Sequence, residues 1–286
     1  MKKLALVLLM GLTLAGCGKK DPNQIIPYGR ENNSGTYTYF KEHVLKEADF
    51  ASNVQTLPGT AAVINAVSKD PKSIGYGGIG YVKGVRILKV KKDANSPGVE
   101  PTQTNVVSGD YPISRYLYFY TVGEPSAQVK PFIDWVMSTE GQKICESVGY
   151  FPLIQDKQVK NPIAAKAGKT TITIKGSDTM VILGQRWAEN YMKEHPSAVV
   201  QITGGGSGTG IAALINGATD ICQASRPIKD NEKAQIKKKF GKDVIEYAVA
   251  MDGIAIFVNE SNPLEEISLD QLKGIYTGST KSWKAL

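Results

Sequence analysis

The sequence of 286 residues has few of the side chains that carry most catalytic and metal chemistry. It contains only two histidines, His43 and His195, and three cysteines. Neither histidine lies in an HExxH motif or at zinc-ligand spacing from a cysteine, so we expect both to be exposed helix residues. The sequence therefore predicts no metal site and no other cofactor.

Cysteine is also too scarce to form a disulfide framework. Apart from Cys17, the chain has only Cys145 and Cys222, and no CxxC motif is present. These two residues could form one disulfide in an oxidising compartment, or they could remain as two partly buried thiols. The sequence leaves both alternatives open.

Long apolar runs are absent apart from one at the N-terminus. Lys2 and Lys3 precede the apolar run 4–14, which ends in Leu14-Ala15-Gly16-Cys17. This pattern is typical of a secretory signal with a lipobox and is too short for a membrane span. We expect residues 1–16 to be a signal peptide and 17–23 a tether lipidated at Cys17. The protein would then be extracytoplasmic, held to a membrane in the periplasm or at the cell surface.

Charge of one sign is not concentrated anywhere in the chain. The formal net charge is +7, but lysines and arginines are dispersed, with no basic patch interleaved with aromatic residues. We therefore expect no nucleic-acid partner. About 260 residues remain after the tether, which is enough for two domains of ordinary size.

The most informative feature that is present is a set of three Gly/Ser/Thr turns, at 33–36, 176–179 and 204–210. Each turn follows a short β-rich run and precedes a helical pattern. Alternation of strand, turn and helix predicts an α/β fold with a ligand beyond the carboxyl ends of its strands. Helix-start N–H groups and hydroxyls are suited to hold an oxyanion. Arg30 adds a planar guanidinium that can bind oxyanion oxygens bidentately.

Two other chemistries are disfavoured by the same turns. The glycine loop 204–210 has no GK[ST] ending, and no acidic residue about twenty positions later completes a dinucleotide fingerprint. Ser34, Ser177 and Ser207 have no evident base beside them in the sequence, so the general base that would activate a nucleophilic serine is missing. We therefore predict a binding protein rather than an enzyme.

Five segments carry a specific resemblance to a known family: 30–36, 176–180, 204–210, 219–226 and 252–259. They resemble the periplasmic phosphate-binding proteins of Pst-type ABC importers. The resemblance implies a two-lobed α/β periplasmic-binding-protein fold of type II, with phosphate in the interlobe cleft. It also implies a non-enzymatic monomer that delivers phosphate to the permease of an ABC importer.

The resemblance also implies a set of phosphate-binding residues. Ser225 stands where well-known members carry an aspartate that accepts the phosphate proton, which puts selectivity over sulfate in question. We expect Asp178, or less readily Asp252, to act as the selectivity acceptor instead. The implied binding residues are Arg30, Ser34, Gly35, Thr36, Thr179, Met180, Ser207 and Ser225.

The order of these segments differs from that of the family. The family segment that runs through Trp283 continues directly into the one containing Arg30, whereas here the two lie at opposite ends. The chain therefore looks like a circular permutant, with 155–169 as a linker between the family's usual ends. We expect Ile25 and Leu286 to lie close together on the surface of one lobe.

The permuted order predicts how the lobes divide the chain. One lobe would contain 24–108 and 259–286 and carry the turn with Arg30 and Ser34. The other would contain 109–258, including the linker, and carry Thr179, Ser207 and Ser225. The hinge would lie near Ser108 and Asn259.

Three other functions remain open at this point. One is a receptor for another tetrahedral oxyanion, such as sulfate, molybdate or arsenate. Another is a secreted phosphate-ester hydrolase that uses the same donors as an oxyanion hole. The last is a phosphate-sensing or adhesive surface protein that has no importer.

Overall fold

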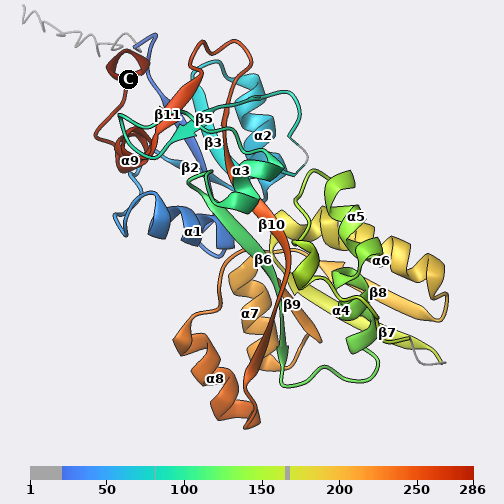
Figure 1. Ribbon diagram of the computed structural model, residues 1–286. Coiled ribbons are helices and arrows are strands. Elements are labelled where there is room, and N and C mark those ends of the chain that lie inside the picture. Colours follow the sequence, from blue (N-terminus) through green and yellow to red (C-terminus); the bar gives the residue numbers. More distant parts are fainter. Residues whose placement is uncertain (1–20, 81, 165–167) are drawn as a thin grey trace, which may run out of the picture.

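The computed structural model describes residues 21–80, 82–164 and 168–286. The predicted signal peptide, Cys17 and residues 18–20 of the predicted tether lie outside the described residues. The described chain forms two α/β lobes, one above the other in Figure 1, which confirms the predicted two-lobed architecture.

The first lobe is built on a β-α-β-α-β unit whose three strands are parallel in the order β2-β1-β3. The elements of this unit are β1 (Ile26–Arg30), α1 (Gly35–His43), β2 (Gln55–Leu57), α2 (Thr60–Lys69) and β3 (Ser73–Gly78). The lobe is completed by β4 (Arg86–Ile87), β5 (Lys89–Lys91), α3 (Gln103–Ser108), β11 (Glu266–Ser268) and α9 (Leu269–Thr277). The final turn is η3 (Trp283–Ala285).

The second lobe repeats this unit, with parallel strands in the order β8-β7-β9. Its elements are β7 (Thr170–Gly176), η2 (Asp178–Met180), α6 (Val181–Glu194), β8 (Ala198–Thr203), α7 (Ser207–Asn216) and β9 (Ile221–Ala224). The other helices of the lobe are α4 (Lys130–Met137), α5 (Thr139–Ser147), the short turn η1 (Gln155–Lys157) and α8 (Asp230–Phe240).

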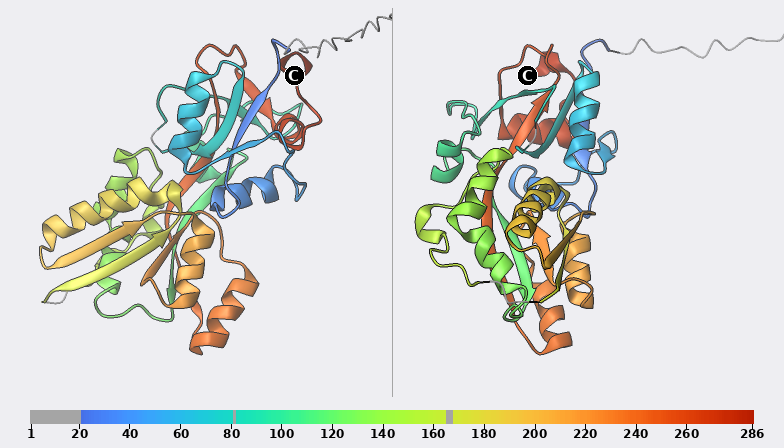
Figure 2. Two further views of the ribbon diagram at one scale, coloured as in Figure 1. Left: turned by 180° about the vertical axis from the view of Figure 1, so that it is seen from behind. Right: turned by 90° about the vertical axis from the view of Figure 1, so that its right-hand side faces the viewer.

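Two long antiparallel strands, β6 (Ser114–Val122) and β10 (Val244–Val258), join the lobes. β10 pairs with β3 of the first lobe and with β6, and β6 pairs in turn with β9 of the second lobe. The two lobes therefore share one continuous hydrogen-bonded sheet. Figure 2 shows the green β6 and the orange-red β10 running from one lobe into the other. The register shifts between Ala248 and Ala250, a β-bulge that bends the strand.

The apolar cores show where the chain passes from one lobe to the other. Ile113 and Ile254 belong to the first-lobe core, which also contains Ile25, whereas Leu117 and Ala250 belong to the second-lobe core with Trp187. The passages therefore lie inside β6 and β10. The permuted segment order predicts them near Ser108 and Asn259, whereas the strands themselves cross the boundary.

The two ends of the described chain lie side by side in the first lobe, as Figure 1 shows for β1 and the C-terminus. The Ile25 amide donates to the Lys281 carbonyl at 2.8 Å, and the Trp283 amide donates to the Asn23 carbonyl at 2.9 Å. The predicted proximity of the two ends is confirmed. Ile25 itself is buried rather than at the surface.

Cys145 and Cys222 are both free thiols in the structure. They lie in different core clusters, and burial raises the pKa of each thiol well above its usual value. Of the two alternatives, the structure therefore shows the pair of buried thiols.

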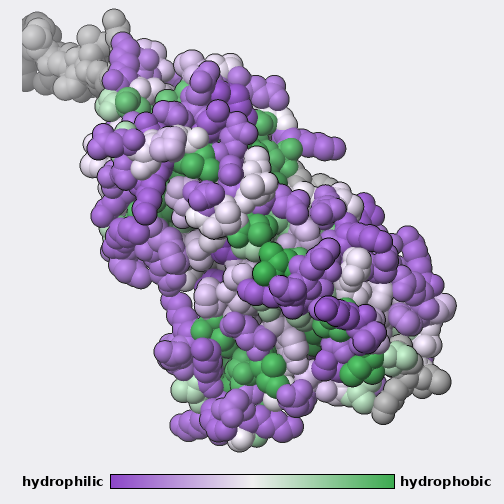
Figure 3. Space-filling view, viewed as in Figure 1, coloured by the Kyte–Doolittle hydropathy of each residue, from purple (hydrophilic) through white to green (hydrophobic). Residues whose placement is uncertain are grey.

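The face of the molecule in Figure 3 is largely hydrophilic, with small hydrophobic areas mainly along its middle. Among the helices that the structure describes, none has the length and apolar character needed to cross a membrane.

Candidate anion-binding site

The three Gly/Ser/Thr turns meet where the two lobes face each other. Thr36, in the first turn of α1, places its hydroxyl 2.9 Å from that of Thr179, in η2 of the second lobe. The amide of Gly208, at the start of α7, donates to the carbonyl of Asn33 at 2.9 Å. The start of α1 therefore contacts two helix starts of the opposite lobe.

Local sequence explains why these helix starts approach so closely. Ser34 caps α1, because its hydroxyl accepts from the amides of Thr36 at 3.2 Å and Tyr37 at 3.4 Å. A Cβ on Gly35 would lie 2.4 Å from the Ser207 hydroxyl, so only glycine fits between the lobes. Gly206 has a φ of +90°, and a Cβ there would lie 2.6 Å from the Asn33 carbonyl.

Ser225, just after β9, is the centre of a hydroxyl cluster in the second lobe. The Ser177 hydroxyl donates to the Ser225 hydroxyl at 2.9 Å, and the Ser207 hydroxyl lies 3.4 Å from it. The Ser225 amide also donates to the Ser207 hydroxyl at 3.1 Å. All the hydroxyl-bearing residues of the site are buried: Ser34, Thr36, Ser177, Thr179, Ser207 and Ser225.

Arg30 ends β1, and its side chain is fully buried. Its guanidinium donates to both oxygens of Glu31, at 3.1 and 3.2 Å, and to Oδ2 of Asp178 at 3.1 Å. Nη1 donates to the Thr60 hydroxyl at 3.2 Å. The structure thus brings the predicted Arg30 to the site, but holds it between two carboxylates.

Arg115, at the start of β6, is a site residue that sequence reasoning missed. It lies opposite Asp252 of β10, and its Nε and Nη2 donate to Oδ2 of that carboxylate at 2.9 and 2.7 Å. Nη2 also donates to the Thr36 hydroxyl at 2.9 Å, and Nη1 donates to the Ser225 carbonyl at 2.8 Å. The residue could not be found from spacing, since its position depends on the register of two strands distant in sequence.

Both predicted selectivity acceptors already accept hydrogen bonds in this structure. Asp178 opens η2 as a turn residue, and its Oδ1 accepts from the Gly205 amide at 2.8 Å while Oδ2 accepts from Arg30. Asp252 is fully buried, and its Oδ1 accepts from the Ile79 amide at 3.0 Å. Burial raises the pKa of Asp252, although Arg115 acts in the opposite direction.

Met180, the remaining predicted residue, brings no side-chain hydroxyl to the site. Its side chain is buried in the second-lobe core, and its amide donates to the Ser177 carbonyl at 3.1 Å within the η2 turn. The next helix residue, Val181, begins α6.

Two further residues near the site were not predicted. Tyr150 donates its hydroxyl to the Thr179 carbonyl, and a Cβ on Gly80 of the first lobe would lie 2.3 Å from its ring. Thr60 begins α2, the helix that corresponds in the repeated unit to α7 of the second lobe. The run Pro58-Gly59-Thr60 after an alternating segment was the available signal for this fourth helix start.

The histidines lie elsewhere. His43 stacks on Tyr39 with ring centroids 4.0 Å apart, and burial lowers its pKa. His195 follows α6, and its ring centroid is 4.3 Å from that of Tyr191. Within the described ranges, no group of three or more His, Cys, Asp or Glu side chains is arranged to hold a metal ion.

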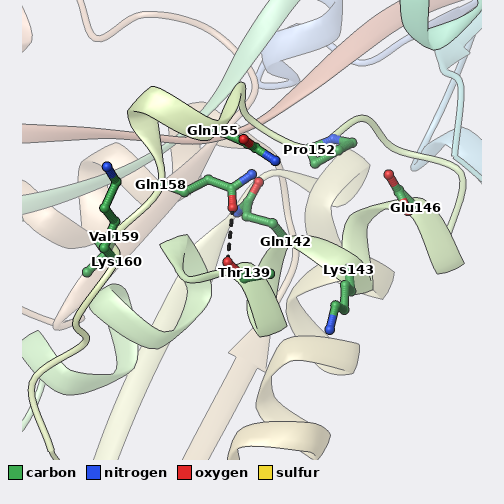
Figure 4. Close-up of a pocket in the computed structure, with 9 residues that line it drawn as sticks. All are labelled: Thr139, Gln142, Lys143, Glu146, Pro152, Gln155, Gln158, Val159 and Lys160. Atoms are coloured by element: carbon green, nitrogen blue, oxygen red, sulfur yellow. Dashed lines mark hydrogen bonds between the residues drawn. The ribbon is translucent and has the colours of Figure 1, made fainter.

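A separate pocket of about 320 Å³ lies beside α5, between this helix and the segment that follows it (Figure 4). Gln142 lines the pocket, and its side-chain NH2 group donates to the carbonyls of Val136 and Val249, at 2.8 and 2.9 Å. None of the predicted binding residues lines it. Its lining residues are Thr139, Gln142, Lys143, Glu146, Pro152, Gln155, Gln158, Val159 and Lys160.

Comparison with known proteins identifies the family. The family model described as PBP superfamily domain matches residues 20–140 and 162–286. The chain is 32% identical to the phosphate-binding protein PstS 2 of Streptococcus agalactiae, over 100% of this chain and 98% of the relative. The chain belongs to the PstS family.

Other members of the PstS family are also similar. The phosphate-binding protein PstS 2 of Streptococcus pneumoniae is 27% identical over 99% of this chain and 97% of its own. The crystal structure of a phosphate-binding protein of a phosphate ABC transporter from Streptococcus pneumoniae TIGR4 aligns with a TM-score of 0.67 and 25% identity. That alignment covers 92% of this chain and 99% of the other. The likeness extends over both lobes and shows a periplasmic-binding-protein fold.

The contact between Gly35 and the opposite lobe generates a first prediction. Gly35→Ala should separate the lobes, since the added Cβ would lie 2.4 Å from the Ser207 hydroxyl and 2.7 Å from that of Ser225. Overpacking of this kind costs about 1–3 kcal/mol. Small-angle X-ray scattering should show a larger radius of gyration for the variant.

Gly29→Ala is the matched control, because its Cβ would meet only atoms of its own lobe at 3.3 Å or more. Equal radii of gyration for wild type and Gly35→Ala would contradict the lobe contact described here.

Proposed function

We propose that this PstS-family chain is an extracytoplasmic solute-binding lipoprotein that captures inorganic phosphate and delivers it to the permease of an ABC importer. The observation that carries the proposal is the convergence of buried hydroxyls from three helix starts at the lobe boundary, next to two arginines. Members of the family are substrate-binding components of transporters. The chain then acts by binding and release, not by catalysis.

The proposed phosphate ligands are the hydroxyls and amides of the three turns, with Arg30 supplying charge. Each hydrogen bond to a charged group contributes about 1.5–3 kcal/mol, so a few of them reach the 8 kcal/mol or so of micromolar affinity. Helix-start dipoles add to the attraction for an anion. The proposed residues are Arg30, Ser34, Gly35, Thr36, Thr179, Met180, Ser207 and Ser225.

The anchor is proposed from the sequence. Residues 1–16 form the signal peptide, Cys17 carries the lipid, and the tether runs to residue 23. The anchored protein acts as a monomer. Its described part begins in the first lobe, so the tether holds that lobe to the membrane.

We also propose that the chain is a circular permutant of the PstS order, with the passages between its lobes inside β6 and β10. The PstS 2 protein of Streptococcus agalactiae, which aligns over 100% of this chain and 98% of its own length, would then share the permuted order. The paired ends support the permutation, because residues 23–25 and 281–283 are hydrogen-bonded to each other. The family model matches in two segments, and the interruption at 141–161 overlaps the proposed linker 155–169. Permutation at such sites leaves packed contacts unchanged.

A receptor for sulfate or another tetrahedral oxyanion is the second candidate. The observation that favours it is Ser225, whose hydroxyl can donate to sulfate as readily as it accepts from phosphate. Asp178 is our proposed discriminator. It accepts two hydrogen bonds, so its carboxylate still has lone pairs for a protonated phosphate oxygen.

Isothermal titration calorimetry of the full-length protein in detergent tests the main proposal. Wild type should bind inorganic phosphate with a Kd of about 1 µM or lower. Arg30→Ala and Ser34→Ala should each weaken binding by about tenfold or more, since each removes a group from the ligand shell. His43→Ala, a change on the exposed end of α1, should leave the Kd unchanged. No binding heat at millimolar phosphate would refute the proposal.

Selectivity is tested by titrating phosphate and sulfate into Asp178→Asn and Asp252→Asn. We expect Asp178→Asn to lower the ratio of phosphate to sulfate affinity, because an amide no longer rejects sulfate by charge. Asp252→Asn should change affinity for both anions to a similar degree. An unchanged ratio in both variants would place the discriminating acceptor elsewhere.

The permutation is tested by rejoining residue 286 to residue 24 through a short Gly/Ser loop and opening the chain near Lys166. The reordered protein should keep both its fold and its phosphate affinity, because the joined residues already lie together. Circular dichroism and calorimetry provide the readout. A reordered chain that unfolds would count against permutation.

A further inference from the structure

The guanidinium of Arg115 occupies the point where the two lobes and the crossing strands meet. It donates to the hydroxyl of Thr36 in the first lobe at 2.9 Å and to the carbonyl of Ser225 in the second at 2.8 Å. Both partners belong to the proposed phosphate shell. In the described part of the chain, Arg30 by contrast donates to none of the hydroxyls of that shell.

Resting on the proposed function, we propose that Arg115 is a second anion-binding arginine of this site, oriented for the ligand by Asp252. It has five N–H groups, and four of them donate to Asp252, Thr36 and Ser225 in the part of the chain that the structure describes. The fifth belongs to Nη1, the nitrogen next to Ser225. It supplies a charged donor at the side of the hydroxyl cluster.

Asp252 fixes the direction in which Arg115 points. The two residues face each other across β10 and β6, and side chains of both are essentially removed from water, at 0% and 1% exposure. The Asp252 carboxylate is itself held by the Ile79 amide, and the Tyr39 ring lies 5.6 Å from the guanidinium carbon. A guanidinium held on three sides loses little conformational freedom when it binds an anion.

Arg30 and Arg115 differ in how much of their charge is compensated. Among the described residues, Arg30 forms ion pairs with Glu31 and Asp178, whereas Arg115 forms one with Asp252 alone. The less compensated guanidinium interacts more strongly with a ligand of higher charge. Arg115 should therefore favour the phosphate dianion over the monoanion.

The test uses Arg115→Gln and Arg115→Lys in the full-length protein, titrated with inorganic phosphate from about pH 5.5 to about pH 8.5, where phosphate passes from monoanion to dianion. Arg115→Gln should weaken binding by about tenfold to hundredfold, and the loss should be larger at the higher pH. Arg115→Lys should recover part of the affinity and of the pH dependence, because it keeps the charge without the forked geometry. Asp252→Asn should weaken binding less than Arg115→Gln.

Arg226→Gln is the matched control. Arg226 follows Ser225 directly and is buried, but its guanidinium donates to Glu232 at 2.6 and 2.8 Å and to the Pro227 carbonyl at 2.9 Å. Arg226→Gln should lower the melting temperature and leave the phosphate Kd within about threefold of wild type. Loss of one charged hydrogen bond to phosphate would change the Kd by more than this.

An Arg115→Gln variant that melts earlier but binds phosphate like Arg226→Gln would overturn the proposal, as would a loss of affinity that is the same at every pH. Should Arg115→Gln fail to fold, Arg115→Lys decides, since a phosphate affinity equal to that of wild type in that variant would overturn the proposal as well. If wild type itself binds no phosphate, the proposed function fails. The same variants are then titrated with sulfate, and an affinity for sulfate unchanged by Arg115→Lys and Arg115→Gln refutes the role of Arg115.

Discussion

The ion pair between Arg115 and Asp252 is the interaction on which the arrangement of the two lobes depends. Taking both charges out of water is costly, and the cost is offset only where geometry is good and the remaining donors and acceptors are satisfied. Here the carboxylate also accepts from Ile79, and the guanidinium also donates to Thr36 and Ser225. The pair is thus tied to the crossing strands and to both lobes at once. A shift of one residue in the register of β6 against β10 would leave both charges buried without partners.

Around this pair, the two lobes present the same β-α-β-α-β unit from opposite sides. Helix starts at α1, η2 and α7 bring hydroxyls and amides to one point, while the ionised groups nearby nearly compensate one another. The guanidiniums of Arg30 and Arg115 form ion pairs with three carboxylates, those of Glu31, Asp178 and Asp252. Because these ion pairs leave no excess of positive charge, an anion would be held by oriented N–H and O–H groups, those of the two guanidiniums included.

The local parts of this design could be predicted from the sequence. Ser34 caps α1 and Gly206 permits the turn before α7, because turn and cap chemistry is written in adjacent residues. The α/β alternation and the meeting of the turns followed from the same signals. Arg115 could not be found, since its role arises from the pairing of β6 with β10 across distant sequence. For the same reason the segment order predicts the passages between lobes near Ser108 and Asn259, whereas they lie within the long strands.

The position of β10 in the sheet has a consequence for how the chain is made. Its last part, Ile254–Val258, pairs with β3, although β3 leaves the ribosome long before it. During synthesis, the edge of β3 that pairs with β10 therefore stays unpaired until β10 has been made. Strands β7, β8 and β9, by contrast, come from one uninterrupted stretch of the chain. Unpaired strand edges invite wrong partners. The first lobe, completed last, is the part of this protein that most needs protection during synthesis.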